Sequence, residues 1–413
     1  MEEWKEYKLI DVLEALIDYR GKTPKKVDSG IPLITAKIVK GGRINEPNEF
    51  LAEEDYDKWM VRGLPKPGDI VLTTEAPLGE VAQLDDRKIA LAQRIVTLRG
   101  KKNVLDNTYL KYYFLSNVGQ SRLKARETGT TVTGIKQSEL REVLVTCPPF
   151  VTQQKIANIL SSLDDKIEVN RRINEQLEEL AGALFKSWFA DFEPFKDGEF
   201  VDSELGMIPK GWKVGTLGEY CKVKSGFAFK SSWWQDNGLK VIKIKNITSD
   251  GVLDMNDCSY VSSENTLKAK DFKTNVGDLL IAMTGATIGK FCMISSKEEM
   301  YVNQRVGKFF LGDNPILKLP FIYCTLKTER VYSEIVNKGQ GSAQPNISGS
   351  DIENIRIPLP EKVDYLLLFN EKLKSVFEKI IKNQQEITHL TTLRDTLLPK
   401  LMSGEIDVNE VKI

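Results

Sequence analysis

The segment from Ile281 to Phe291, IAMTGATIGKF, resembles a phosphate-binding loop. Such a loop has a glycine, four residues and then Gly-Lys followed by Ser or Thr, so that backbone N–H groups surround the phosphates and the hydroxyl reaches Mg²⁺. Here Thr284 stands where the first glycine is needed, and Phe291 takes the place of the hydroxyl residue. Because two required positions differ, the segment does not predict nucleotide binding.

A second candidate for chemistry is the tetrapeptide CPPF, Cys147 to Phe150, which resembles the Asn/Asp-Pro-Pro-Tyr/Phe sequence of amino-methyltransferases. Cys147 stands where those enzymes have the Asn or Asp that binds the target amine. No glycine-rich cofactor loop follows a predicted strand elsewhere in the chain. The chain has one histidine, His389, and five scattered cysteines without C-x-x-C spacing. This composition argues against zinc sites and against a nucleophile paired with histidine, so we expect no catalytic or metal-binding residues.

Charge is balanced over the whole chain and uneven along it. The 413 residues carry 58 Lys and Arg against 58 Asp and Glu, so net charge gives no argument for nucleic acid. Between Lys210 and Lys245 there are eight lysines against Glu219 and Asp236, and Phe227, Phe229, Trp233 and Trp234 are interleaved with them. This run fits a solvated face over buried aromatics and also a surface that faces phosphates. No apolar run approaches the roughly 20 residues that span a bilayer, so we expect a cytoplasmic protein.

Comparison of the sequence with itself reveals an internal repeat. GDIVLTTEAPLGEVAQL from Gly68 aligns with GDLLIAMTGATIGKFCMI from Gly277, with one extra residue in the second copy, and Gln93-Arg94 then matches Gln304-Arg305. GTTVTGIKQSELREVLVTCPP similarly aligns with GSAQPNISGSDIENIRIPLP. A long helical segment follows each copy, so the order along the chain is module, helix, module, helix.

Each module is predicted to be a compact α+β domain with a largely antiparallel sheet. Short runs such as DIVLT, RIVTL and DLLIAM lie between Gly, Asn and Asp turns and are typical of strands, whereas NTYLKYYFLSNV and LPFIYCTLKTERVYSEIV are helical in pattern. The predicted fold is α+β, with modules at residues 1–150 and 193–360 and long helices at 151–192 and 361–413.

The helical segments both show the spacing of a coiled coil. An asparagine within such a seam costs stability but fixes the register, so we predict that Asn170 and Asn383 set the register of two antiparallel helices, with the chain ends close together. Pro399 is expected to kink or end the second helix near Leu397. The predicted seam residues are Leu160, Leu163, Ile167, Asn170, Leu177, Leu180, Leu184 and Trp188 in the first helix, and Leu366, Phe369, Leu373, Val376, Ile380, Asn383, Ile387, Leu390 and Leu397 in the second.

Three segments of the chain closely resemble the specificity subunits of type I restriction-modification systems. QQKIANILSSLDDKIEVNRRINEQLEELAGALFKSWFADFEPF is similar to the central region of that family, SELGMIPKGWKVGTLGEY to the start of its second target-recognition domain, and LLPKLMSGEIDV to its C-terminus. The resemblance covers essentially the whole chain. It implies target-recognition domains at 1–150 and 193–360, joined by a central coiled-coil helix at 151–192 and followed by a C-terminal helix and tail at 361–413.

This resemblance implies a non-catalytic DNA-binding subunit. Each module would read one half of a bipartite sequence in double-stranded DNA, while the helices set the gap and dock two methyltransferase subunits and, through them, endonuclease subunits. The chemistry of S-adenosylmethionine and ATP would belong to those partners, so the chain would bind no cofactor itself. Two alternatives remain, a structural coiled-coil spacer and, less favoured, a DNA methyltransferase.

Target-recognition domains should expose Lys or Arg for phosphates and amide, hydroxyl or guanidinium groups for base edges. The repeated Gln-Arg pairs are expected to serve the shared scaffold, whereas divergent positions such as Lys37 and Lys245 are better candidates for specificity. The candidates in the first module are Lys22, Thr23, Lys25, Lys26, Lys37, Lys40, Thr73, Thr74, Gln93, Arg94, Thr130 and Thr131. Those in the second are Lys224, Ser225, Lys230, Lys243, Lys245, Asn246, Thr284, Thr287, Lys290, Asn303, Gln304, Arg305, Ser342 and Gln344.

Overall fold

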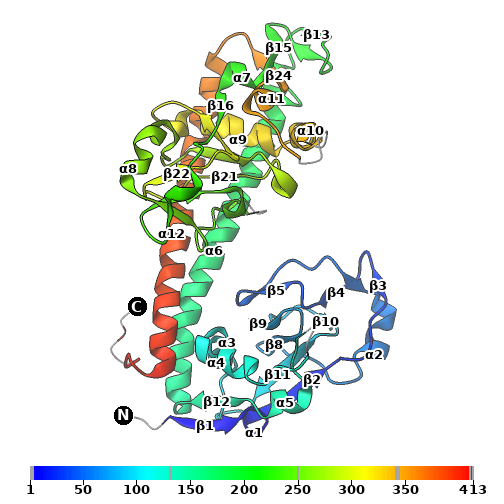
Figure 1. Cartoon of the computed structure of the whole chain (residues 1–413). Helices are drawn as coiled ribbons and strands as arrows, with labels where there is room; N and C mark the ends of the chain where they lie inside the picture. The colour runs from blue at the N-terminus through cyan, green and yellow to red at the C-terminus, as the bar shows by residue number, and fades with distance from the viewer. Residues whose placement is uncertain (1–3, 130–132, 249–250, 340–344, 409–410, 412–413) are drawn as a thin grey trace. The chain divides into compact units, whose positions relative to one another are not determined.

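The fold is that of a computed structural model, which describes residues 4–129, 133–248, 251–339, 345–408 and 411. Its contacts divide the chain into two compact units (Figure 1). The first unit combines Met1–Ile167 with His389–Ile413, and the second comprises Glu168–Thr388. Each unit therefore contains one module together with parts of both long helices. None of the helices in the described parts of the chain is long and apolar enough to cross a membrane.

The first unit is built on an antiparallel sheet of four strands in the order β2-β11-β8-β9. Every residue of the inner strand β8 is buried. Ile70 and Leu72 face one hydrophobic cluster and Val71 faces another, because successive side chains of a strand point to opposite sides. The strands are β2 (Leu13–Asp18), β8 (Ile70–Thr74), β9 (Leu78–Gln83) and β11 (Ile95–Gly100).

Helices cover one face of this sheet and a smaller sheet covers the other. Tyr109 and Phe114 of α3 share a cluster with Ile70, while Leu33 of the smaller sheet shares the cluster of Val71. The smaller sheet has the order β10-β4-β7-β3, formed by β10 (Ala90–Leu91), β4 (Ile31–Ile34), β7 (Phe50–Leu51) and β3 (Lys26–Val27). The remaining elements are β1 (Lys5–Lys8), α1 (Leu9–Val12), β5 (Val39–Lys40), β6 (Arg43–Ile44), α2 (Tyr56–Trp59), α3 (Asn107–Leu115), α4 (Asn117–Lys124), α5 (Gln137–Arg141) and β12 (Leu144–Cys147).

The second unit repeats this plan. Its antiparallel sheet has the order β16-β23-β20-β21, formed by β16 (Lys222–Ser225), β23 (Val306–Phe310), β20 (Leu279–Ala282) and β21 (Phe291–Met293). The smaller sheet has the order β17-β19-β18-β22, formed by β17 (Trp234–Gln235), β19 (Ser259–Val261), β18 (Leu239–Ile242) and β22 (Met300–Val302). The predicted α+β fold with duplicated modules is confirmed.

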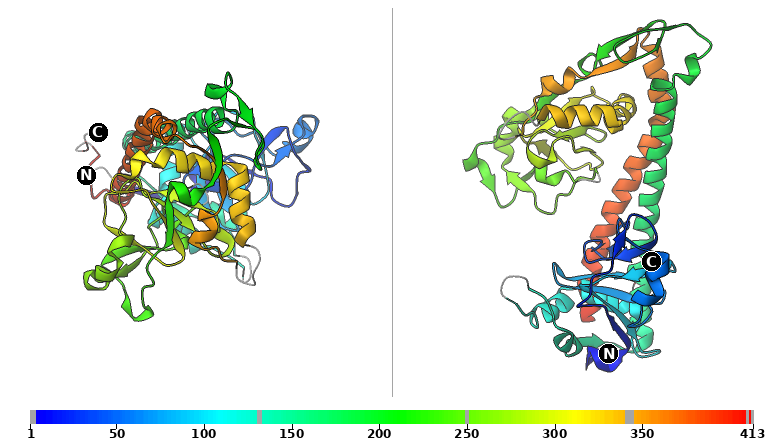
Figure 2. Two further views of the ribbon diagram at one scale, coloured as in Figure 1. Left: turned by 90° about the horizontal axis from the view of Figure 1, so that it is seen from above. Right: turned by 90° about the vertical axis from the view of Figure 1, so that its right-hand side faces the viewer.

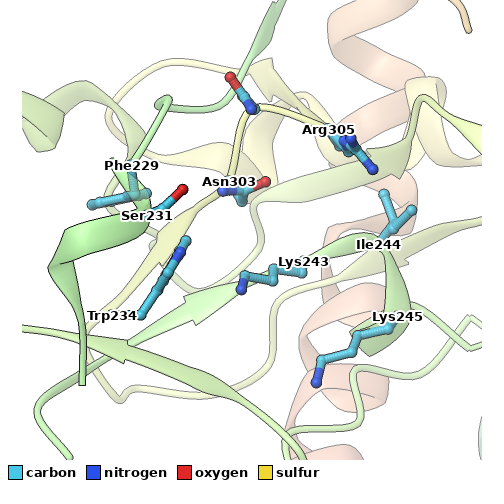
Figure 3. A pocket seen from close by; sticks show the side chains of 9 residues that line it. Phe229, Ser231, Trp234, Lys243, Ile244, Lys245, Asn303 and Arg305 are labelled. Atoms are coloured by element: carbon cyan, nitrogen blue, oxygen red, sulfur yellow. The ribbon is translucent and has the colours of Figure 1, made fainter. Parts of the chain in front are cut away.

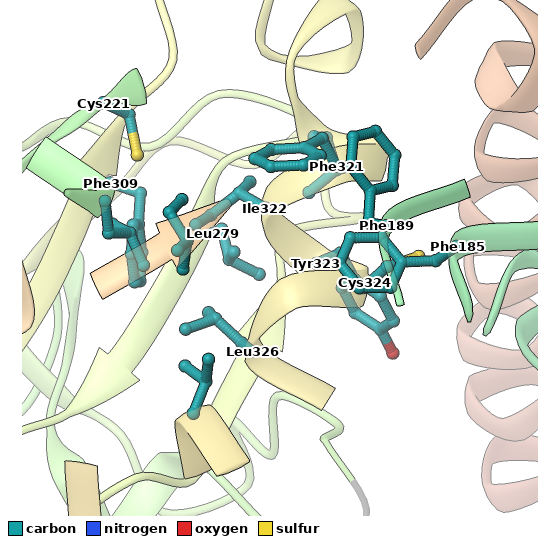
Figure 4. Packing of buried hydrophobic residues seen from close by; sticks show 14 of the residues in the cluster. Phe185, Phe189, Cys221, Leu279, Phe309, Phe321, Ile322, Tyr323, Cys324 and Leu326 are labelled. Carbon is teal, nitrogen blue, oxygen red and sulfur yellow. The ribbon is translucent and has the colours of Figure 1, made fainter. Parts of the chain in front are cut away.

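Helices and short strands complete the second unit. Phe185 and Phe189 of the first long helix pack against Phe321 of α9, with ring centroids 5.8 and 4.9 Å apart (Figure 4). This aromatic packing joins the helix to the module. The remaining elements are β13 (Phe200–Val201), β14 (Ile208–Pro209), β15 (Trp212–Thr216), α7 (Leu217–Tyr220), α8 (Ser263–Thr266), α9 (Leu319–Lys327), α10 (Glu329–Gly339), α11 (Gly349–Glu353) and β24 (Arg356–Pro360).

The repeated Gly-Asp pair at the start of β8 and β20 belongs to the scaffold. Asp69 and Asp278 each accept a hydrogen bond from the backbone N–H three residues upstream, at 2.8 and 2.7 Å. Each also pairs with a cation of the neighbouring strand, Asp69 with Arg99 at 2.7 Å and Asp278 with Lys308 at 2.8 Å. The aspartates therefore hold the turn and the strand together in both copies.

The segment TGATIGKF forms a strand, a turn and a strand. A short 3-10 helix, Gly285–Thr287, links β20 to β21. Gly289 has a φ of 86°, and its repeat counterpart Gly79 has a φ of 92°. A side chain would be strained at such angles, and at Gly79 a Cβ atom would also lie 2.7 Å from Oε1 of Gln120. The glycine shared by the two copies thus marks a turn of the scaffold.

Two helices of 40 residues run through both units, α6 (Phe150–Phe189) and α12 (Asp364–Ser403). The two helices lie side by side in both views of Figure 2. In the second unit Asn170 contacts Glu386 and Asn174 contacts Asn383. The partner's number falls as the residue number rises, so the helices are antiparallel, as predicted.

Both predicted register residues are buried between the helices, with Asn170 1% and Asn383 0% exposed. They do not bind each other. The Asn383 amide donates to Oδ1 of Asn174 at 2.8 Å, and the Asn170 amide donates to Oε2 of Glu386 at 3.0 Å. Asn174, which the sequence pattern missed, donates in turn to the backbone oxygen of Ile380 at 3.3 Å. A role for these residues in fixing the register stays a prediction.

One predicted seam position and the predicted end of the second helix are wrong, whereas the kink expected at Pro399 stays a prediction. Leu180 is 55% exposed, and the seam position is occupied instead by its neighbour Ala181, which is fully buried. The second helix does not end near Leu397 but continues through Pro399 to Ser403. Its last turn is held by Leu401 and Met402, which are buried in the core of the first unit, so tertiary packing outweighs the cost of the proline.

Candidate nucleic-acid interface

The lysines predicted to contact phosphates in the first unit lie at its surface. Lys26 and Lys37 approach Glu49, with Nζ–Oε distances of 2.7 and 3.9 Å. The lysine side chains are 44% and 82% exposed, although Glu49 is only 21% exposed, so both lysines are accessible to a phosphate. The three other lysines are exposed and form no ion pair with another described residue: Lys22, Lys25 and Lys40.

Three predicted contacts are withdrawn because the side chains are buried. Thr73 is fully buried and its hydroxyl accepts from the backbone N–H of Glu80 at 2.9 Å, while Thr74 is 1% exposed. Asn246 is 2% exposed, and its amide group binds the backbone of Lys243, Asp254 and Asp257. The base edges and phosphates of DNA cannot approach these atoms unless the strand or turn unfolds. Four further candidates lie outside the described residues: Thr130, Thr131, Ser342 and Gln344.

The Gln-Arg pair of the first unit is occupied by local contacts. Arg94 donates from Nε to Oε1 of Glu75 at 2.9 Å. The hydroxyl of Thr23 donates to Oε1 of Gln93 at 3.3 Å. Arg94 also has a φ of 72°, a left-handed conformation that is uncommon for a residue with a side chain.

In the second unit, the candidate residues gather around two neighbouring hollows. The first has a volume of about 350 Å³ and the second of about 600 Å³. Ile244, Gln304 and Arg305 line both. The first hollow is also lined by Phe229, Ser231, Trp234, Lys243, Lys245 and Asn303 (Figure 3). The second is also lined by Ser225, Met283, Thr284, Gly285, Pro345, Asn346, Ile347 and Ser348.

Lysines of the basic run pack over its aromatic rings. Nζ of Lys243 lies 3.7 Å from the centroid of the Trp234 ring, and Nζ of Lys230 lies 5.4 Å from that of Trp233. Burial, together with the nearby Lys245, lowers the pKa of Lys243. Figure 3 shows Lys243 between Trp234 and Ile244. The run therefore combines half-buried aromatics with cations at the surface of the hollow.

The other candidates of the second unit differ in exposure and in whether their polar groups already have a partner within the protein. Lys245 is exposed and pairs with Asp257 at 2.5 Å. The hydroxyl of Thr287 donates to the backbone oxygen of Thr284 at 3.1 Å, which leaves only its lone pairs for a ligand. Lys224 and Ser225 are exposed, and Lys290 is partly exposed.

Several residues that line the hollows were missed at the sequence level: Ser231, Ile244, Met283, Asn346 and Ser348. One of them, Ser348, belongs to a sequence pattern that could have been recognised. Ser348 is followed three residues later by Asp351, and the two form a reciprocal capping box at the start of α11, a pattern that marks a helix N-terminus. Ile244 and Met283 gave no such signal, because only the fold brings them to the rim.

The description "Type I restriction modification DNA specificity domain" belongs to a family model that matches residues 1–179 and again residues 209–392. The chain belongs to the type I restriction-modification specificity subunits. It is therefore a DNA specificity subunit, a non-catalytic component of such systems, and the alternative of a DNA methyltransferase is excluded.

Individual relatives agree with this family over nearly the whole chain. The MjaIX specificity subunit of Methanocaldococcus jannaschii is 33% identical, over 99% of this chain and 95% of its own length. The HindI specificity subunit of Haemophilus influenzae is 25% identical, over 98% of this chain and 100% of its own length. The crystal structure of a type I S subunit from M. genitalium has a TM-score of 0.60 at 20% identity, covering 97% of this chain and 96% of that one, which supports the fold.

Proposed function

We propose that each module of this specificity subunit reads one half of a bipartite DNA sequence. The main sheet has the equivalent strand order in both modules, and a smaller four-stranded sheet accompanies it in each. Each module therefore has the parts of an independent DNA-reading domain. Their loops differ in sequence, as two different half-sites require. A helix of 40 residues is about 60 Å long, which exceeds the about 34–36 Å of one turn of B-DNA. The helix pair could therefore act as the ruler for the gap.

The observation that carries this proposal is the chemistry around the hollows of the second unit. Lys243 and Lys245 supply positive charge, while the exposed Gln304 and Arg305 supply groups that can pair with base edges; Asn303 lines the same hollow but is only 8% exposed. Lysine and arginine bind phosphates, and Asn, Gln and Arg pair with adenine and guanine in the major groove. A structural spacer has no need of such a surface.

We further propose that the helices dock two methyltransferase subunits, which in turn recruit endonuclease subunits. The relatives are named as specificity subunits of type I restriction enzymes, and a non-catalytic specificity subunit needs partners that perform the reaction. The repeat gives each partner copy an equivalent helix to bind. In this proposal S-adenosylmethionine and ATP act in the partner subunits and not in this chain.

A footprint tests this function directly. The full chain, assembled with the methyltransferase subunits of its own system, should protect two short segments of duplex DNA separated by an unprotected gap. Sequencing of methylated sites in cells that carry the whole system should yield one bipartite motif. A spacer without reading function would leave no footprint and no motif, and a single continuous motif would contradict two independent readers.

A further inference from the structure

The Gln-Arg pair that occurs in both modules has two different environments. Arg94 pairs with Glu75 at 2.9 Å. Arg305 is exposed and forms no ion pair or side-chain hydrogen bond with any other residue in the described parts of the chain. The same arginine is thus neutralised in one module and free in the other.

This difference can be traced to one position of the repeat. Glu75 and Thr284 are each the seventh residue after the repeated glycine, Gly68 or Gly277. The backbone confirms that the positions are equivalent, because Glu75 forms an antiparallel bridge with Gly134 and Thr284 forms one with Asn346, which aligns with Gly134. Where the first module has a carboxylate facing its arginine, the second has a neutral hydroxyl.

The surroundings of Arg305 favour a ligand rich in hydrogen-bond acceptors. Arg305 lines both hollows, and neither hollow has an acidic residue among those that line it. Lys243 and Lys245 add two further cations to the first hollow. The site therefore presents donors that the protein itself leaves unused.

We infer that Arg305 reads a guanine in the half-site of the second module, whereas Arg94 makes no base contact in the first. The planar guanidinium would donate two hydrogen bonds to O6 and N7 of guanine, the pairing that arginine favours in the major groove. The exposed amide group of Gln304 beside it suits a neighbouring base edge, whereas Asn303 is only 8% exposed. Glu75 would repel the phosphates around a base that approached Arg94. This inference rests on the proposed function.

Substitutions guided by the repeat test this assignment. Thr284→Glu places a carboxylate where the first module has Glu75. The new carboxylate should pair with Arg305 and keep the guanidinium from contacting a base. Arg305→Gln removes the guanidinium without adding charge, and covers the case in which Thr284→Glu fails to fold. Arg94→Gln is the matched control in the other module. Each variant of the full chain, assembled with methyltransferase subunits, is used to select sequences from a randomised duplex DNA library.

The wild-type complex should enrich a bipartite motif. Thr284→Glu and Arg305→Gln should each lose about tenfold or more of the preference for one G·C pair in a single half-site, and Arg94→Gln should leave both half-sites unchanged. An Arg305→Gln complex with an unchanged motif, or with uniformly weaker binding to all sequences, would overturn the guanine assignment. A loss of base preference in Arg94→Gln would overturn the asymmetry. If the wild type enriched no bipartite motif, the proposed function itself would fail.

Discussion

Asp164 of α6 joins three helices of the first unit. Its carboxylate accepts hydrogen bonds from the hydroxyl of Tyr112 at 2.6 Å, from Lys111 at 3.2 Å and from Arg394 at 2.8 Å. Burial alone would raise the pKa of Asp164, but Lys111, Tyr112 and Arg394 outweigh it, and the pKa is lowered. The charged carboxylate is therefore the form that holds α3 and α12 on α6.

Replacing this carboxylate should weaken the first unit in a pH-dependent manner. Asp164→Asn leaves Lys111, whose side chain is only 9% exposed, without its counter-charge. We expect a loss of about 2 kcal/mol at pH 7, below the about 3–5 of a fully buried pair, because Asp164 is 22% exposed. Since the folded pKa lies below the unfolded value, this stabilisation is present above about pH 4 and is lost as the pH falls through the folded pKa.

Urea unfolding of the full chain at pH 7 and pH 3.5, with hydrogen exchange in α3 as the local readout, measures this effect. The wild type should lose more stability between the two pH values than Asp164→Asn does. Asp165→Asn, at an exposed position of the same helix, is the matched control and should behave as the wild type. Equal pH dependence in Asp164→Asn and the wild type would contradict the role of the carboxylate.

The sequence alone did not predict which of the candidate side chains are buried. Three of the candidates named from the sequence of the second module, Lys243, Asn303 and Arg305, line one hollow. Burial was not predictable for Thr73 or Asn246, because a hydroxyl or amide in a β-rich segment has the same sequence pattern whether it faces solvent or a turn. Only the packed strand decides which atoms remain free.

At the scale of elements, the helix pair contains a small polar network within an apolar seam. Asn174 and Asn383 are 8% and 0% exposed, and the Asn383 amide donates to Asn174 at 2.8 Å. Removing one member of such a pair leaves a buried polar group unsatisfied, whereas removing both can be nearly neutral. The network should therefore cost little overall and penalise every register that separates its members.

A double-mutant cycle tests this view. Asn383→Leu alone should lower the unfolding free energy by about 1–3 kcal/mol, because the buried Oδ1 of Asn174 loses its donor. Asn174→Leu combined with Asn383→Leu should recover most of that loss, but the helices should then adopt mixed registers or oligomers. Unfolding in urea gives the first quantity, and light scattering together with the spacing of the two footprints gives the second. A stable monomer with unchanged spacing in the double variant would refute a role in register.

The repeat predicted the helices and their direction, but not every residue of their seam. Leu180 and Ala181 show the reason, since an α-helix has 3.6 residues per turn and a seam of period 3.5 drifts around it. The larger apolar residue is the better guess for a buried position. In this helix the small Ala181 is fully buried and Leu180 is exposed, a choice that depends on what packs opposite.

At the scale of the whole molecule, the end of the chain stabilises its beginning. Leu401, Met402 and Val408 are buried in one cluster with Leu9 and Val12. Residues that are remote in sequence thus belong to a single core. Any exchange of the first module must preserve this packing, since a core residue without a matching neighbour leaves a cavity.

Exchange of the first module should change one half-site and leave the other intact. Residues 1–150 are replaced by the corresponding part of the relative that is 33% identical, once alone and once together with residues 389–413. Both chimeras should recognise the same new motif, because the recognition residues proposed for the first module lie within 1–150. The second chimera should have the higher melting temperature, since it keeps the C-terminal residues matched to their core. Sequencing of methylated sites reads the motif, and a change in both half-sites would mean that the modules do not read DNA independently.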